Sequence, residues 1–273
     1  MAEKPLNIGV TGITGRMGQA IAKAALDDQR AELMGAFSRN AADYDDDALG
    51  KMLGLSKFTK AIESVEGAKG EDIDSLIDFT HPSSLPLHLD WCKATGTPLV
   101  LGTTGLSEDD ERLINEHVKD IPILYSGNMS FGIAVMQSMV EKMAKVLGED
   151  FDIEVIETHH RYKKDAPSGT AYMLANAAAK GRGLDLSDAA IFDRQGETGE
   201  RDKGMIGMQS IRGGDVIGDH TVMFLGSGER LEITHKATDR SLFAKGAVHA
   251  AKWLHGQAPG LYTIRDVVRD QAL

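Results

Sequence analysis

Short apolar segments alternate with helical patterns through the first half of the chain. The pattern predicts strands at 6–11, 31–37, 73–80, 98–101 and 121–125, and helices at 19–26 and 107–118. A further helix is predicted after the turn at His81-Pro82, and it contains Leu85, Leu89 and Trp91. Residues 40–72 are acidic, punctuated by glycines and weakly periodic, which favours a variable surface excursion. Alternating strands and helices predict a doubly wound parallel sheet, in which ligands bind at the carboxyl ends of the strands.

The second half begins with a similar pattern. An apolar helix is predicted at 133–147, with methionines that we assign to the core. A strand at 151–156 alternates apolar and acidic residues. The next helix is predicted to begin after Ser168, a typical N-cap residue, and to stop at Gly181.

The pattern then changes to β structure. Residues 182–204 are polar and loop-like, and they could form either a flap or a subunit contact. Strands predicted at 205–211, 216–225 and 230–236 are separated by glycine-containing turns, which favours an antiparallel meander. Helices at 239–255 and 263–269 follow, and we expect the C-terminal segment to pack on the first domain. The predicted fold is therefore a Rossmann-like parallel domain plus an α+β domain with a mixed, largely antiparallel sheet.

Composition narrows the class of protein. The 273 residues carry a net charge of −11, which argues against nucleic acid as the main partner. The single cysteine, Cys92, excludes an internal disulfide and fits a reducing cytosol. Glu3 and Lys4 lead directly into a strand, which is not the pattern of a signal peptide, and no apolar run reaches membrane-spanning length. We therefore expect a soluble cytoplasmic protein.

The segment Gly12-Ile-Thr-Gly15-Arg-Met-Gly18 lies between the first strand and the first helix. The spacing is a variant of the dinucleotide fingerprint, in which glycines let the backbone approach a pyrophosphate at the helix N-terminus. A tight turn that binds nothing would have the same glycines. The strand before it and the helix after it favour the cofactor.

The second strand ends at Ser38-Arg39, about 20 residues after the glycines, where the ribose-recognising residue of such folds belongs. A carboxylate there would favour NADH, whereas an arginine pairs with the 2′-phosphate of NADPH. We therefore expect NADPH to bind at least as well as NADH, unless Arg39 is an ordinary solvated side chain.

Polar or glycine-rich residues follow each predicted parallel strand. They are Gly12–Gly18, Arg39, Thr80-His81, Gly102–Thr104 and Ser126–Met129. Because the carboxyl ends of parallel strands meet at one edge of a sheet, these segments predict a single nucleotide site.

The most unusual stretch runs from Glu157 to Thr170 and combines two histidines with a cationic cluster before a predicted helix. Backbone N–H groups at Ser168-Gly169-Thr170 would bind one anionic group, and Lys163 with a histidine would bind another. This arrangement suits a small dicarboxylate. A histidine or lysine would also supply the proton that hydride transfer to a C=N or C=C bond requires.

Two other interpretations of this stretch are open. Histidine is a common metal ligand, but adjacent His159 and His160 point to opposite faces of a strand, and no H-x-H or H-x-x-x-H spacing occurs there. We therefore predict no metal. The histidines could also be ordinary surface residues in a charged loop.

Together these motifs resemble the dihydrodipicolinate reductase family, also called 4-hydroxy-tetrahydrodipicolinate reductases. The similarity covers nearly the whole chain. Its motifs are Val10–Gly18, Asp78-Phe-Thr80, Gly102-Thr-Thr-Gly105, Glu157-x-His-His-Arg-x-Lys163, Asp165-Ala-Pro-Ser-Gly-Thr-Ala171, Gly199-Glu-Arg201 and Gly228–Ala237.

The resemblance implies an NAD(P)H-dependent reduction of 4-hydroxy-tetrahydrodipicolinate to tetrahydrodipicolinate, in lysine biosynthesis by the diaminopimelate route. It also implies a homotetramer, with residues 1–130 and 240–273 binding the dinucleotide and residues 131–239 forming the substrate and tetramerisation domain. His159 would be a proton donor and acceptor, and Lys163 a proton donor.

The resemblance also assigns the binding residues. Those implied for substrate binding are His160, Lys163, Ser168, Gly169 and Thr170. Those implied for cofactor binding are Gly12, Ile13, Thr14, Gly15, Arg16, Met17, Arg39, Gly102, Thr103, Thr104, Ser126, Gly127, Asn128 and Met129.

Three positions depart from the family pattern. Ser38 replaces an acidic residue, His81 stands where arginine is common, and Ser126-Gly-Asn-Met replaces a sequence similar to Ala-Asn-Phe. All three concern the cofactor side. Two other functions stay open at this point: a nucleotide-sensing protein without turnover, and a different nicotinamide-linked reductase.

Overall fold

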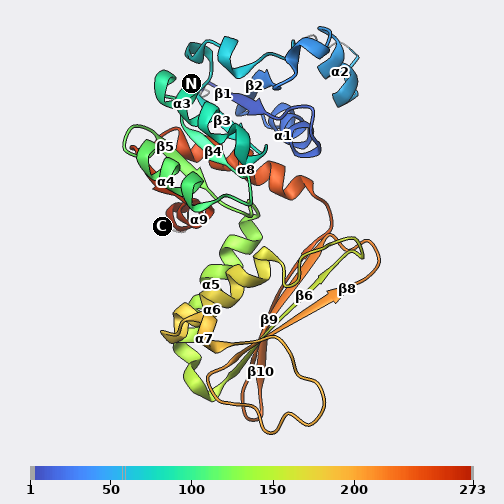
Figure 1. Cartoon of the computed structure of the whole chain (residues 1–273), viewed down its shortest axis with the longest axis vertical. Helices are drawn as coiled ribbons and strands as arrows, with labels where there is room; N and C mark the ends of the chain where they lie inside the picture. The colour runs from blue at the N-terminus through green and yellow to red at the C-terminus, as the bar shows by residue number, and fades with distance from the viewer. Residues whose placement is uncertain (1–3, 57, 59, 272–273) are drawn as a thin grey trace. The chain divides into compact units, whose positions relative to one another are not determined.

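The computed structural model describes residues 4–56, 58 and 60–271, and the chain forms two compact units. Unit 1 comprises Met1–Met129 and Ser241–Leu273, and unit 2 comprises Ser130–Arg240. The expectations for residues 1–3 and 272–273, including the N-terminal Glu3, lie outside the described residues. Each unit has its own sheet (Figure 1).

Unit 1 contains a six-stranded sheet whose order is β11-β5-β4-β3-β1-β2. All its paired strands are parallel, so the doubly wound prediction is confirmed. Its strands are β1 (Leu6–Thr11), β2 (Ala31–Phe37), β3 (Ser75–Asp78), β4 (Leu99–Leu101), β5 (Pro122–Tyr125) and β11 (Gly260–Tyr262). The sequence pattern did not indicate β11, which has only three residues and extends the edge beside β5.

The described part of unit 1 also contains helices. They are α1 (Arg16–Asp27), α2 (Ala48–Leu53), α3 (Leu85–Thr95), α4 (Glu108–His117), α8 (Ser241–Leu254) and α9 (Ile264–Gln271), with 3₁₀ turns at 41–43, 65–67, 70–72 and 82–84. The C-terminal α8 packs against α1 and the parallel strands. Ser107 begins α4 with a capping box to Asp110, as its acidic first turn suggests.

The segment 40–72 is more ordered than its sequence pattern predicts, at its described positions. It contains α2, and Leu49, Leu53, Ile62 and Val65 are buried. Backbone hydrogen bonds join Glu63 to the second strand, from Glu63 N to Ala36 O and from Ser38 N to Glu63 O, both 2.9 Å. Most described residues of this segment are at least partly exposed, as expected of a surface excursion, but four apolar side chains anchor it to the unit.

Unit 2 contains a five-stranded mixed sheet whose order is β10-β9-β6-β8-β7. Its strands are β6 (Asp152–His159), β7 (Ala190–Ile191), β8 (Ile206–Arg212), β9 (Gly218–Leu225) and β10 (Arg230–Ala237). β9 is antiparallel to β6 and β10, whereas β8 is parallel to β6 and β7. The mixed sheet is confirmed.

The predicted meander is wrong in one respect. β8 and β9 do not form a hairpin, because β6 lies between them. Gly213-Gly214 therefore starts a connection that crosses the end of β6, with Gly213 N bound to His159 O at 2.9 Å and His160 N bound to Val216 O at 2.7 Å. Local turn residues predict the turn but not which strand lies beyond it.

Three helices belong to unit 2: α5 (Phe131–Leu147), α6 (Gly169–Arg182) and the short α7 (Leu186–Ala189), with a 3₁₀ turn at 148–150. α5 and α6 lie side by side, and α6 packs on β6, β8 and β9 (Figure 1). Gly181 lies inside α6, where a Cβ would meet Glu141 O of α5 at 2.3 Å, and the helix instead stops at Gly183 with φ +69°. The expected stop at Gly181 is therefore wrong, since that glycine serves close helix packing.

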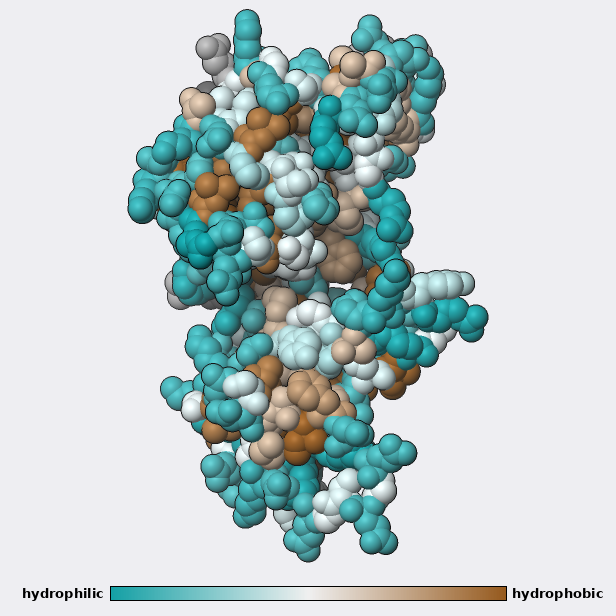
Figure 2. Space-filling view, in the orientation of Figure 1, coloured by the Kyte–Doolittle hydropathy of each residue, from teal (hydrophilic) through white to brown (hydrophobic). Residues whose placement is uncertain are grey.

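The core of unit 2 lies between these helices and the sheet. It includes Val140, Ile153, Leu174, Val222 and Phe224. The expected core role holds for Met136 but not for Met139, which is 47% exposed. Figure 2 shows that hydrophilic residues dominate the visible surface, with smaller hydrophobic patches on both units.

Candidate active site

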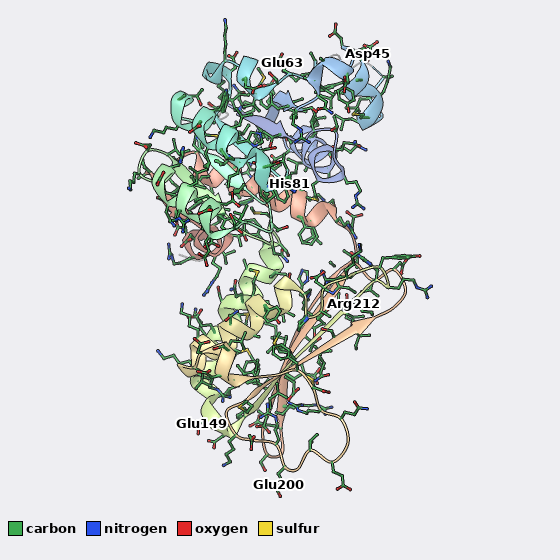
Figure 3. The ribbon with its side chains drawn as sticks, viewed as in Figure 1. Asp45, Glu63, His81, Glu149, Glu200 and Arg212 are labelled. Carbon is green, nitrogen blue, oxygen red and sulfur yellow. The ribbon has the colours of Figure 1, made fainter. Side chains whose placement is uncertain are left out.

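Polar side chains gather at one end of the face of the unit 2 sheet that α6 covers. The register places Glu157 opposite Ser210 of β8 and His220 of β9, and His159 opposite Arg212. Because side chains alternate between faces, residues 157 and 159 share one face. Figure 3 shows Arg212 at this end of the sheet and Glu149 and Glu200 at the other. The strand extends through His159, so the predicted loop begins later than its sequence suggests.

Glu157 is buried, at 1% exposure, and both oxygens of its carboxylate accept hydrogen bonds. It accepts hydrogen bonds from Arg212 at 2.7 and 2.8 Å, from the Ser168 N–H at 3.2 Å and from His159 Nδ1. Burial works to raise the pKa of Glu157, but the bonds from Arg212, Ser210 and His159 outweigh it and lower the pKa from 4.5 to about 2. Glu157 is therefore ionised at neutral pH.

Two buried imidazoles adjoin this carboxylate. The rings of His159 and His220 meet edge to face, with centroids 5.2 Å apart. Burial lowers the pKa of His159 below its ordinary value, and the hydrogen bond to Glu157 offsets only part of that effect. Burial, with the neighbouring His159, lowers the pKa of His220 to about 4. Both rings are therefore neutral near pH 7.

Ser168 caps α6, as its sequence position predicts. Its hydroxyl accepts from Ala171 N at 3.1 Å and lies 3.1 Å from His220 Nε2. Gly169 and Thr170 open the helix, whose N-terminus favours negative charge. The N-terminus of α6 is thus fixed beside the Glu157–His159 pair.

The loop from His160 to Pro167 carries the remaining predicted residues. Lys163 Nζ binds Asp165 Oδ2 at 2.9 Å, and Arg212 donates to Asp165 O at 2.7 Å. Nδ1 of His160 is buried without a hydrogen-bond partner among the described residues. A buried polar atom of this kind is a contact that a ligand would satisfy.

Unit 1 contains a cleft of about 460 Å³ at the carboxyl ends of β1, β2 and β3. The predicted residues that line it are Gly12, Thr14, Gly15, Ser38, Arg39, Thr80 and His81. Gly12 has φ +62°, and a Cβ there would meet Thr80 Cγ2 at 2.8 Å. Glycine therefore keeps the backbone open at the turn, and the volume suits a small-molecule cofactor.

The other predicted cofactor residues follow the neighbouring strands of the same edge. Thr103 accepts from Thr80 N at 3.0 Å and so joins the exits of β3 and β4. A Cβ on Gly102 would meet the Phe79 ring at 2.2 Å. Arg16 and Met17 open α1, and Ser126 N binds Leu101 O at 3.1 Å, which holds Ser126–Met129 beside β4.

Two predicted cofactor residues, Ile13 and Met129, are buried, at 0% and 1% exposure. They belong to the core of unit 1, so neither presents an exposed surface to a nucleotide in this structure. A buried Asp78 supports the same edge. It accepts from Thr80 N at 2.9 Å and pairs with His88 at 2.7 Å.

Within the described part of the chain, no group of three or more histidine, cysteine or acidic side chains is arranged to hold a metal ion. No helix formed by the described residues is long and apolar enough to cross a membrane.

The fold and the cleft define a two-unit protein with a dinucleotide-type domain, and comparisons with known proteins identify its family. The models "Dihydrodipicolinate reductase, N-terminus" and "Dihydrodipicolinate reductase, C-terminus" match residues 6–129 and 132–268. The 4-hydroxy-tetrahydrodipicolinate reductase of Hahella chejuensis is 45% identical over 261 residues, which is 96% of this chain and 98% of that protein. The chain belongs to the dihydrodipicolinate reductase family.

Solved structures show the same fold. A dipicolinate-bound dihydrodipicolinate reductase from Paenisporosarcina has a TM-score of 0.72 at 22% identity, covering 95% of this chain and 97% of that one. The apo scyllo-inositol dehydrogenase of Lactobacillus casei has a TM-score of 0.58 at 16% identity, covering 98% and 94%. At these identities the likeness concerns the fold alone.

Sequence reasoning did not assign Glu157, Arg212 or His220 to the site. Glu157 stood inside the unusual stretch, and its place two residues before His159 on a strand was a usable signal. No local feature marked Arg212 or His220, since strand pairing alone brings them there. Three further residues of the cleft were not predicted: Tyr44, Ser64 and Glu66. The reason is related, because residues 40–72 were not expected to contribute to the cofactor cleft.

Proposed function

We propose that this chain reduces 4-hydroxy-tetrahydrodipicolinate to tetrahydrodipicolinate with NADPH or NADH, in the diaminopimelate route to lysine. The observation that carries the proposal is the placement of His159, Lys163 and the N-terminus of α6 on one polar end of unit 2. These residues occur in a chain that aligns over 96% of its length with a reductase of that name.

His159 and Lys163 are the proposed proton-transfer residues. Hydride addition to a conjugated imine leaves a carbon or nitrogen that must gain a proton, and a positioned acid typically contributes about 100- to 10,000-fold in rate. A 4-hydroxyl group that leaves as water must gain one as well. The ammonium group of Lys163 suits the donation of a proton, and the neutral imidazole of His159 suits the acceptance of the proton that the neighbouring carbon loses when water leaves.

The substrate carboxylates are proposed to bind His160, Lys163, Ser168, Gly169 and Thr170. The unpartnered Nδ1 of His160 and the positive end of α6 support this assignment. Ser168 contributes mainly by holding the helix start, because its hydroxyl and its N–H already bind Ala171 and Glu157.

The dinucleotide is proposed to bind unit 1, where it supplies the hydride. The glycine turn at 12–15 leaves room for a pyrophosphate beside α1, and Arg39 in the cleft lining suits the 2′-phosphate of NADPH. The same lining includes the Glu66 carboxylate, which suits a ribose hydroxyl. The cleft therefore contains a group that suits the 2′-phosphate of NADPH and a group that suits the ribose hydroxyl of NADH.

A homotetramer and a cytoplasmic location belong to the same proposal. On the sheet face opposite α6, Ile211 is 51% exposed, an apolar position suited to subunit contact. Light scattering on purified protein should give the mass of four chains, and a monomer would contradict the assembly. The buried free thiol of Cys92 fits a reducing compartment.

The activity is tested by supplying the enzyme with NADPH and the condensation product of pyruvate and aspartate semialdehyde, made in the cuvette by the preceding synthase. Loss of NADPH absorbance that needs both the synthase and this protein is the expected result. Binding of NADPH without oxidation would indicate a nucleotide-binding protein instead. Oxidation with an unrelated carbonyl substrate alone would indicate a different reductase.

A further inference from the structure

The buried Glu157 is the most densely bonded carboxylate near the site. Donors from four residues surround its two oxygens: two Arg212 nitrogens, the Ser168 N–H, His159 Nδ1 and the Ser210 side chain. A buried ion pair of this kind is weak evidence for a stabilising role, because well-packed apolar residues often replace such a pair without loss of stability. The bond to His159 is the one with a chemical consequence.

That bond fixes the tautomer of His159. An ionised carboxylate only accepts hydrogen bonds, so Nδ1 must carry the proton. In a neutral ring, Nε2 then presents a lone pair. His159 therefore begins as a proton acceptor, although the same ring donates once it has been protonated.

The surroundings of Nε2 keep it in place. A Cβ on Gly218 would lie 2.9 Å from His159 Nε2, so the glycine leaves space where any other residue would crowd the ring. His220 covers the ring edge to face from β9. His159 is thus held by hydrogen bonding on one nitrogen and by packing around the other.

We propose that Glu157, itself anchored by Arg212, is a positioning residue that holds His159 with Nε2 as the proton acceptor of the resting enzyme. The inference rests on the proposed function for the identity of the reaction. It assigns the first proton donation to Lys163, whose ammonium group has a proton to give. His159 donates only after it has taken a proton up.

Charged and titratable groups from each neighbouring element set the pH response of His159. Glu157 of β6 favours the imidazolium, whereas Arg212 of β8 and Lys163 of the loop disfavour it, as does burial beside His220 of β9. Removal of the Glu157 charge leaves only the opposing effects. The pKa of His159 therefore falls further in a Glu157→Gln enzyme.

The kinetic test compares three variants. Glu157→Gln should lower kcat by about 100-fold or more and move the acid limb of kcat/KM down by about one pH unit or more, with the Kd for NADPH unchanged. In Glu157→Asp, the acid limb of kcat/KM should stay at its wild-type pH, and part of the wild-type kcat should be retained. Glu154→Gln is the matched control: it removes a buried, arginine-paired carboxylate on the other face of the same strand, and its limb should not move.

A second measurement needs no variant that might fail to fold. In wild-type protein labelled with ¹⁵N-histidine, the His159 signals should show a protonated Nδ1 and an unprotonated Nε2. An Nε2–H tautomer, or an unmoved acid limb in folded Glu157→Gln enzyme, would overturn the inference. Because the tautomer is measured without substrate, an enzyme that fails to oxidise NADPH would refute only the proposed function.

Discussion

The two candidate sites consist of different kinds of chemical group. The cleft of unit 1 lies at strand exits and combines a glycine turn with hydroxyl, aromatic and a few charged side chains. The site of unit 2 consists of charged and imidazole side chains around the buried carboxylate of Glu157. Binding a cofactor needs shape and N–H groups, whereas moving a proton needs groups whose pKa values the fold can adjust.

This difference predicts that single side chains matter more in unit 2 than in unit 1. Lys163→Ala should lower kcat by about 100- to 10,000-fold, since the proton donor is lost. The Kd for NADPH, measured by fluorescence titration, should stay within about twofold. Lys164→Ala, which removes the adjacent exposed lysine, should keep near-normal turnover. A large loss of NADPH affinity in Lys163→Ala would contradict this assignment, because it would show that Lys163 contacts the cofactor rather than the substrate.

Within unit 2, we expect some residues to affect the free energy of unfolding without affecting kcat. Arg201 binds Asp152 at 2.9 Å, Met205 O at 2.7 Å and Ile153 O at 3.1 Å, at the start of β6, whereas Arg212 pairs with its last residue, His159. Arg201→Ala should lower the free energy of unfolding by about 2 kcal/mol or more, measured by urea denaturation. The kcat of the folded variant should change little. Lys203→Ala, in the same loop, should leave the unfolding midpoint unmoved, and an equal effect from both would contradict the assigned contacts.

The smallest effect is expected in unit 1. Arg39→Ala should raise the Kd for NADPH by about tenfold, the equivalent of one charge-assisted hydrogen bond of about 1.5 kcal/mol. The Kd for NADH should change by less than about twofold, because NADH has no 2′-phosphate. Equal weakening of both cofactors would show that Arg39 does not contact that phosphate.

The same difference explains what the sequence could predict. The parallel sheet and the glycine turn were predictable because a strand, a turn and a helix that follow one another in the chain are also neighbours in space. The N-cap role of Ser168 was equally local. In contrast, Arg212 and His220 reach Glu157 only because β6 lies between β8 and β9. That order follows from long-range packing, and the turn at Gly213-Gly214 taken alone predicts a hairpin instead.

The buried network also altered how the central stretch is understood. From sequence, it was a loop with two histidines and an unassigned glutamate. In the structure His159 ends a strand, and its ring binds a carboxylate whose ionisation decides which nitrogen is free. Burial and pairing set these properties, so residue type and spacing alone could not predict them.

The central claim, that the chain is a reductase using a nicotinamide hydride, is tested most directly by isotope transfer. NADPH deuterated at one or the other C4 position is supplied with the enzymatically formed condensation product, and the product is analysed by mass spectrometry. One of the two labelled forms should give tetrahydrodipicolinate containing a single deuterium. Product without deuterium from both forms would contradict the account.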